Sequence, residues 1–168
     1  MKTSVAISAE TVRPPAGTIL DAIGNTPLVQ VDGIWVKLEY LNPSGSIKAR
    51  IAKYMIERAE REGLLKPGDT IVEASSGNTG NAMSMVAAVK GYRMLVVMPA
   101  GLSPERTAIS RAFGAEVLTV GDFHVTDALA KVRELGDQPG YFAPRTQAGA
   151  RGSWRPFTAL RIFTGWCG

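Results

Sequence analysis

The chain has 168 residues, of which 45% are hydrophobic and 20% charged, a composition typical of a soluble globular protein with one core. No apolar run is long enough to cross a membrane, and a single cysteine and a single histidine exclude an internal disulfide and a histidine-based metal site. The net charge of +4 is too small to indicate a polyanionic partner. We therefore expect a cytoplasmic protein without a signal peptide that binds no metal, nucleic acid or membrane.

The first fifth of the chain contains a loose lead-in and two short strands. Residues 1–17 show no periodicity and are expected to form an N-terminal extension. Thr18 is placed to cap a short helix that Gly24 ends. Two apolar segments follow, 28–31 and 34–38, joined by an Asp-Gly turn signal. We expect them to be paired strands, with the second one buried.

From Lys48 onward, helical periodicity alternates with short apolar runs. Brief turns rich in glycine and proline separate these segments. This alternation predicts an α/β fold, a three-layer arrangement with a parallel sheet flanked by helices. The expected helices begin at Lys48, after the loop Ser75–Gly80, at Pro104 and at Val125, and the expected strands are 70–74, 93–98, 116–120 and 141–142.

The composition changes after Arg145. Residues 146–168 contain Arg151, Arg155 and Arg161 but no Asp, Glu or Lys, and the strand-helix alternation ends before them. We predict a domain over residues 18–145 and an aberrant, poorly ordered tail over residues 146–168; a basic aromatic patch for membrane or RNA is the alternative. Our hypothesis for this tail is out-of-frame translation of a longer gene. Reading the other two nucleotide frames after Arg145 tests it.

Two loops have the composition of a ligand site. Ligands of open α/β sheets bind beyond the carboxyl ends of the strands, where helices begin. The loop Asn42–Lys48 follows the second short strand, and the loop Ser75–Gly80 follows the strand that ends at Ala74. Both supply small hydroxyl side chains and free backbone N–H groups, which suit a carboxylate or a phosphate. Simple helix capping by serine or asparagine is the alternative for the second loop.

Lys48 lies at the first turn of its predicted helix, where the free N–H groups favour anions rather than cations. Lys48 is either a solvated surface lysine or an amine that meets a bound ligand. An amine beside an anion cradle suits a Schiff base with pyridoxal phosphate and the carboxylate of an amino acid. Phosphoryl transfer fits less well, because the sequence has no GxxxxGK[ST] motif and neither loop has an acid for Mg²⁺.

Four motifs stand in order along the chain: IGNTPLV (23–29), KLEYLNPSGSIKAR (37–50), EASSGNTG (73–80) and SPERTAISRAFGAEV (103–117). With these motifs the chain resembles the cysteine synthase and cystathionine β-synthase family of fold-type II pyridoxal-phosphate enzymes, over about residues 18–145. The resemblance implies the N-terminal half of that fold, with the second domain largely missing.

The resemblance also implies a role for each loop residue. Lys48 would be the Schiff-base lysine and the base that removes the α-proton of the substrate, and Asn78 would bind the 3′-oxygen of pyridoxal 5′-phosphate. The implied reaction replaces the acetoxy group of O-acetylserine by sulfide, with release of acetate, to give L-cysteine, in an enzyme that is a homodimer in this family. The residues that would bind the substrate carboxylate are Ser75, Ser76, Gly77 and Thr79.

The sequence departs from the family after Arg145, and the family's phosphate-binding loop has no counterpart in residues 146–168. We therefore expect weak or no turnover by this chain alone. Within the family, a cystathionine β-synthase acting on serine, a threonine synthase and a serine/threonine dehydratase remain alternatives. A non-catalytic half-domain, either a pseudogene product or the partner of another chain, is the alternative from a different class.

Overall fold

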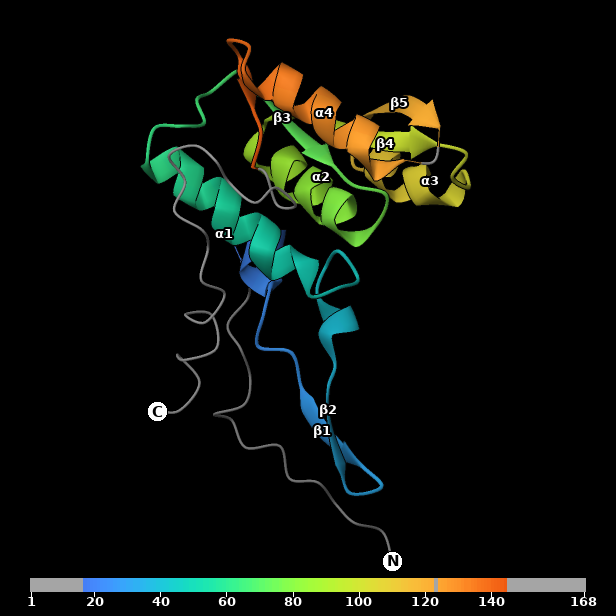
Figure 1. Cartoon of the computed structure of the whole chain (residues 1–168). Coiled ribbons are helices and arrows are strands. Elements are labelled where there is room, and N and C mark those ends of the chain that lie inside the picture. The colour runs from blue at the N-terminus through green and yellow to red at the C-terminus, as the bar shows by residue number, and fades with distance from the viewer. Residues whose placement is uncertain (1–16, 123, 145–168) are drawn as a thin grey trace, which may run out of the picture.

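The computed structural model describes residues 17–122 and 124–144 (Figure 1). Its centre is a parallel sheet of four strands in the order β5-β4-β3-β6. The sheet confirms the predicted α/β class, and each strand starts within one residue of its expected position. The strands are β3 (Thr70–Ala74), β4 (Arg93–Ala100), β5 (Glu116–Asp122) and β6 (Tyr141–Phe142).

Helices cover both faces of this sheet and make the three expected layers (Figure 1). On one face lie α2 (Asn78–Lys90), against β3 and β4, and α3 (Glu105–Ala112), against β5. The other face is covered by α4 (Val125–Gly136). The helix α1 (Lys48–Arg61) packs on α2 rather than on the sheet. All five residues of β3 are buried, because this strand is covered on both faces.

Each face of the sheet has its own apolar core. The larger cluster fills the space between α1, α2 and the sheet, and Ile56, Ile71 and Met83 are fully buried in it. The smaller cluster joins the opposite face of the sheet to α4 through Val72, Val97 and others. Burying this apolar surface is the dominant favourable term in folding, at about 25 cal/mol per Å². None of the helices in the described ranges is long and apolar enough to span a membrane.

The direction in which successive strands are added to the sheet reverses at β3. From β3 the chain passes through α2 to β4 and through α3 to β5, moving one strand outward each time. It then returns through α4, on the opposite face, to pair β6 with the other edge of β3. Such a reversal opens a crevice beyond the carboxyl ends of the strands, the common ligand position in open α/β sheets. The loop after β3 starts at the carboxyl end of this strand, where the strand order reverses.

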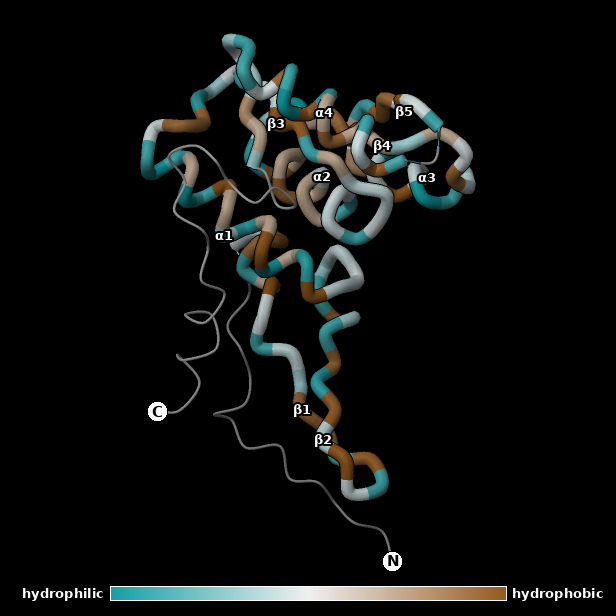
Figure 2. The backbone as a smooth tube through the Cα atoms, in the orientation of Figure 1, coloured by the Kyte–Doolittle hydropathy of each residue, from teal (hydrophilic) through white to brown (hydrophobic). Residues whose placement is uncertain are grey.

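The hairpin of β1 (Leu28–Val31) and β2 (Ile34–Lys37) corrects our expectation for this segment. The two strands pair antiparallel and project away from the domain (Figure 1). The second strand is not buried: Ile34 is 67% exposed and Trp35 is 63% exposed. Figure 2 shows the apolar residues running along this exposed hairpin. An apolar run indicates that a strand needs cover, but it does not indicate that this part of the chain supplies it.

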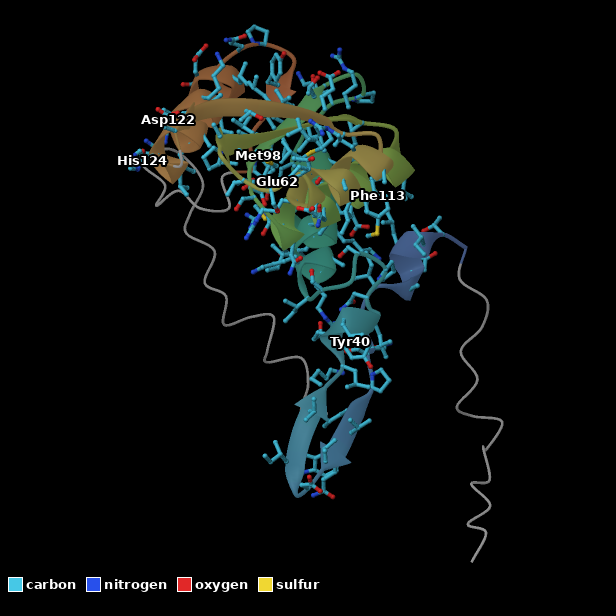
Figure 3. All side chains as sticks on the ribbon, turned by 90° about the vertical axis from the view of Figure 1, so that its right-hand side faces the viewer. Tyr40, Glu62, Met98, Phe113, Asp122 and His124 are labelled. Atoms are coloured by element: carbon cyan, nitrogen blue, oxygen red, sulfur yellow. The ribbon has the colours of Figure 1, made fainter. Side chains whose placement is uncertain are left out.

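Two 3-10 helices flank the hairpin. The first is η2 (Ile19–Ala22), where the hydroxyl of Thr18 accepts a 3.2 Å hydrogen bond from the backbone N–H of Leu20. The carboxylate of Asp21 accepts a bond from the backbone N–H of Thr18 in return, which completes a capping box. This confirms Thr18 as a helix cap. The second, η3 (Glu39–Leu41), was not predicted, and Tyr40 marks the junction of hairpin and domain (Figure 3).

Candidate functional site

Lys48 and the loop after β3 lie at one end of the domain. Lys48 is the first residue of α1, and Asn78 is the first residue of α2. The two helices pack together, and both begin on the side where the arrows of β3 and β4 end (Figure 1). The sequence therefore predicted correctly that both loops open a helix. The position of the first loop was partly wrong, because β2 belongs to the hairpin and not to the parallel sheet.

The loop after β3 is held by Ser75, whose side chain is buried. Its hydroxyl accepts hydrogen bonds from the backbone N–H of Gly80 at 2.8 Å and of Gly77 at 3.3 Å. Gly80 permits this because a Cβ there would lie 3.2 Å from Cβ and Oγ of Ser75 and from Cγ1 of Val96. Ser75 thus shapes the loop in this structure, and its predicted contact with a substrate carboxylate stays a prediction.

Beyond Ser75 the loop and the start of α2 have backbone donors that are free to bind a ligand. Among the described residues, none accepts a hydrogen bond from the backbone N–H of Asn78 or Thr79, the first two residues of α2. The Asn78 side chain is exposed, Ser76 and Gly77 are half-buried, and nothing lies within 4 Å of the position of a Cβ on Gly77. Free N–H groups at a helix N-terminus attract anions. This end of α2 can therefore receive a carboxylate or a phosphate.

Lys48 is half-buried, and a small polar loop precedes it. The hydroxyl of Ser46 accepts a 3.2 Å hydrogen bond from the backbone N–H of Lys48. The hydroxyl oxygen of Ser44 is buried and has no hydrogen-bond partner among the described residues. A buried hydroxyl without a partner costs free energy, about 1–3 kcal/mol, that a bound polar ligand would recover. The amine, this hydroxyl and the N–H groups of α2 fit a cofactor with a carbonyl, a ring hydroxyl and an anionic group.

One residue at this end escaped the sequence analysis. The guanidinium of Arg106, on α3, donates a 3.2 Å hydrogen bond to the backbone oxygen of Ser76. The contact connects α3 to the loop across 30 residues of sequence. The arginine lies in the motif SPERTAISR, but the motif alone gives no indication of which loop it meets. The described residues contain no cluster of His, Cys, Asp and Glu that could hold a metal.

Comparisons with known proteins identify the family of the chain. The family model "Pyridoxal-phosphate dependent enzyme" matches residues 19–151. A cysteine synthase of Staphylococcus aureus (strain N315) is 48% identical over 140 residues, which are 78% of this chain and 45% of that protein. A cysteine synthase B of Pseudomonas syringae pv. syringae is 46% identical over 143 residues, 80% of this chain and 79% of that protein.

Solved structures give the same result. A cysteine synthase from Entamoeba histolytica superposes with a TM-score of 0.76 and 38% identity, over 84% of this chain and 46% of that one. A hydrogen sulfide-producing enzyme from Fusobacterium nucleatum gives 0.73 and 43%, over 79% and 46%. The chain thus spans less than half the length of these neighbours. Since the family model matches more than half of its residues, the chain belongs to the pyridoxal-phosphate dependent enzymes.

Proposed function

We propose that this chain carries the lysine-bearing half of a cysteine synthase-like enzyme, which replaces the acetoxy group on the β-carbon of O-acetylserine by sulfide, with release of acetate, to give L-cysteine. The observation that carries the proposal is that α1, which begins at Lys48, and α2, which begins at Asn78, start on the side of the domain where β3 ends. The 48% identity to a cysteine synthase supports this reaction over others known in the family.

The residues at this end divide into two groups by role. Lys48 would hold pyridoxal phosphate through its amine and, when released, take the α-proton of the substrate. Asn78 would bind the ring oxygen of the cofactor. The bound cofactor would supply a conjugated electron sink for the negative charge that develops at the substrate α-carbon. The substrate carboxylate would be received by the N-terminus of α2 and by the side chains or backbone of Ser75, Ser76, Gly77 and Thr79.

Orientation is the contribution of the protein. A carboxylate held at the N-terminus of α2 fixes one end of the amino acid, so that its α-carbon faces Lys48. Because Ser75 and Gly80 hold the loop to the sheet, the carboxylate would be bound at a fixed height above β3. Holding reactants in the reactive geometry is worth several kcal/mol of barrier, up to about 7–11 kcal/mol in the best cases.

A direct experiment tests the role of Lys48. The purified full-length chain is incubated with pyridoxal phosphate, reduced with borohydride and digested, and the peptides are analysed by mass spectrometry. We expect the pyridoxyl group on Lys48, and loss of this label in Lys48→Ala but not in Lys66→Ala, which removes an exposed lysine. A label spread equally over all lysines would refute the proposal.

Turnover by the 168-residue chain itself is proposed to be weak, because it spans 45% of the length of its Staphylococcus relatives. Cysteine formation from O-acetylserine and sulfide measures it, and efficient turnover would overturn this part. The observation that favours the alternative, a non-catalytic half-domain, is the exposed apolar hairpin. Co-purification with a second polypeptide that restores turnover would favour that reading.

A cytoplasmic location and a homodimer are proposed together with the enzyme. The single cysteine supports the location, and the family resemblance supports the homodimer.

A further inference from the structure

The motif IGNTPLV has no role in the site described so far, yet its turn Gly24–Thr26 contacts the first turn of α1. Five residues from three segments meet there, and we refer to them as the Arg50 clamp. Gly24 and Thr26 come from the turn, Glu39 and Asn42 from η3 and the residue after it, and Arg50 from the first turn of α1. The clamp brings together both ends of the segment that leads to Lys48.

The centre of the clamp is a two-pronged ion pair. Nε of Arg50 lies 2.9 Å from Oε2 of Glu39, and Nη2 lies 2.8 Å from Oε1. The hydroxyl of Thr26 donates a 2.6 Å hydrogen bond to Oε1 and accepts one of 3.3 Å from Nη2 of Arg50. Nδ2 of Asn42 donates to Oε2 at 3.0 Å. A carboxylate with four donors and a guanidinium in fork geometry has little freedom to move.

Asn42 and Gly24 connect this ion pair to the backbone. The side-chain oxygen of Asn42 accepts a 3.0 Å bond from the backbone N–H of Gly24, and its Nδ2 donates a 2.7 Å bond to the backbone oxygen of Glu39. Gly24 has a φ of +94°, and a Cβ there would lie 2.9 Å from Nη1 of Arg50. Glycine is therefore required for both the backbone conformation and the space. The loop that ends at Lys48 starts from a fixed point at Asn42.

Besides the clamp, two backbone hydrogen bonds hold the start of α1, from the N–H of Ala49 to the oxygen of Ser46 and from the N–H of Arg50 to the oxygen of Ile47. Its N-cap residue, Ile47, makes no side-chain capping bond, and Ser46 accepts a single bond from the backbone N–H of Lys48. Successive residues of a helix are turned by 100°, so Arg50 and Lys48 point to nearly opposite sides of the first turn. An anchored Arg50 therefore holds the helix from one side while Lys48 stays available on the other.

The clamp adds little net charge beside Lys48. The guanidinium of Arg50, with help from the Thr26 and Asn42 side chains, lowers the pKa of Glu39 from its ordinary 4.5 to about 2, although burial opposes this. The hydrogen bonds that Arg50 donates to Glu39 raise the pKa of Arg50, although burial opposes this. Both groups are therefore ionised at every pH at which such an enzyme works, and their charges cancel.

We propose that the Arg50 clamp is the positioning device for Lys48, fixing the loop 42–47 and the first turn of α1 so that the lysine amine meets the cofactor carbonyl at one place. This rests on the proposed function of Lys48 for its chemical consequence. Arg50, Glu39, Thr26 and Asn42 are positioning residues and act only through the backbone that carries Lys48.

The test compares substitutions in the clamp with a control substitution in a second ion pair, whose arginine also lies on α1. Arg50→Lys keeps the charge but loses the fork, Glu39→Gln keeps the shape but loses the charge, and Arg58→Lys is the control in the exposed Arg58–Glu62 pair. Two readouts are taken on each full-length variant: the rate at which pyridoxal phosphate is trapped on Lys48 by borohydride, and amide hydrogen exchange of residues 42–50. Circular dichroism confirms that each variant is folded.

We expect the clamp variants to trap the cofactor on Lys48 about 10- to 100-fold more slowly than the control, since small misplacements of reacting groups cost this much. Exchange at residues 42–50 should accelerate about tenfold or more, while β3 and β4 keep their protection. Trapping and exchange equal to those of Arg58→Lys would overturn the proposal. If the wild-type chain is never labelled on Lys48, the proposed function fails, and the exchange measurement alone decides whether the clamp fixes the loop. If Arg50→Lys does not fold, Glu39→Gln carries the same two measurements.

Discussion

The hydroxyl of Ser110 donates a 2.8 Å hydrogen bond to the side-chain oxygen of Asn81, and both side chains are buried. Ser110 lies on α3, and Asn81 lies in the first turn of α2, directly after the residues proposed to receive the substrate carboxylate. Arg106 reaches the same loop from the surface of α3, at the backbone oxygen of Ser76. A buried bond and an exposed bond thus connect α3 to the loop after β3.

Ser110→Ala should therefore destabilise the protein. The change leaves a buried amide oxygen without its donor, which costs about 1–3 kcal/mol of the free energy of unfolding. Urea denaturation measures this loss. The control is the double-mutant cycle with Asn81→Ala, in which the pair should show a coupling of about 1 kcal/mol. Additive effects of the two substitutions would mean that the bond contributes nothing.

Acid should weaken the Arg50 clamp in a defined pH range. The pKa of Glu39 is about 2 in the folded protein, below its ordinary value of 4.5, so the folded state favours the ionised carboxylate. The stability from this pair is complete above pH 4.5 and is lost as the pH falls from 4.5 towards 2. After allowance for solvent screening the loss is about 1–2 kcal/mol.

Glu39→Gln should accordingly be less stable than wild type at pH 7, and the difference between them should shrink below pH 4.5. Urea unfolding at a series of pH values from 7 to 2.5 measures both curves. The control is Glu62→Gln, which removes the charge from the exposed ion pair with Arg58 of α1, and it should show no such change. Parallel curves for wild type and Glu39→Gln would contradict the prediction.

Gly24→Ala should cost more stability than Gly33→Ala. Both glycines have a positive φ, +94° and +81°, which an alanine adopts at a cost of about 1–2 kcal/mol. Only Gly24 has a neighbour in the way: its new Cβ would lie 2.9 Å from Nη1 of Arg50, whereas nothing lies within 4 Å at Gly33. Arg50 cannot move aside without breaking its bonds to Glu39. Thermal denaturation of the two variants separates the cost of the backbone conformation, which both share, from the steric clash, which only Gly24→Ala has. Equal losses of stability would show that Arg50 moves aside at little cost.

Gly80→Ala should distort the loop after β3. The added Cβ would lie 3.2 Å from both Ser75 and Val96, and it would push the first turn of α2 away from the sheet. The 2.8 Å bond from Gly80 to Ser75 should lengthen or break. We expect a loss of about 1–3 kcal/mol, typical of overpacking, measured by urea denaturation. Gly77→Ala, where nothing lies within 4 Å, should leave the free energy of unfolding nearly unchanged.

Much of this architecture could be predicted from the sequence, because it is encoded locally. Helical and strand periodicity located the strands of the parallel sheet, and Thr18 was recognised as a cap from its position before a helical segment. Lys48 was placed at a helix start for the same reason, because a break in periodicity after a run of small polar residues marks an N-terminus. The second helix was expected after Gly80, but α2 begins at Asn78. Local patterns of this kind depend on neighbours within a few residues.

The features that were missed depend on contacts between distant residues. Arg50 and Thr26 are separated by 24 residues, and Ser110 and Asn81 by 29, so no local pattern joins them. The burial of Ile34 and Trp35 was predicted wrongly for a related reason. An apolar side chain is consistent with cover from any source, and the sequence of the strand does not say where that cover comes from.

The exposed hairpin also has a practical consequence for spectroscopy. Trp35 is the only tryptophan in the described part of the chain, and it is 63% exposed on β2, away from both cores. In a variant with Trp154→Phe and Trp166→Phe, the fluorescence of Trp35 would change little when the domain unfolds, because this side chain is already in water. The emission would shift to shorter wavelength when another surface covers the hairpin. The fluorescence of Trp35 would then report contacts of the hairpin and would hardly depend on whether the sheet is folded.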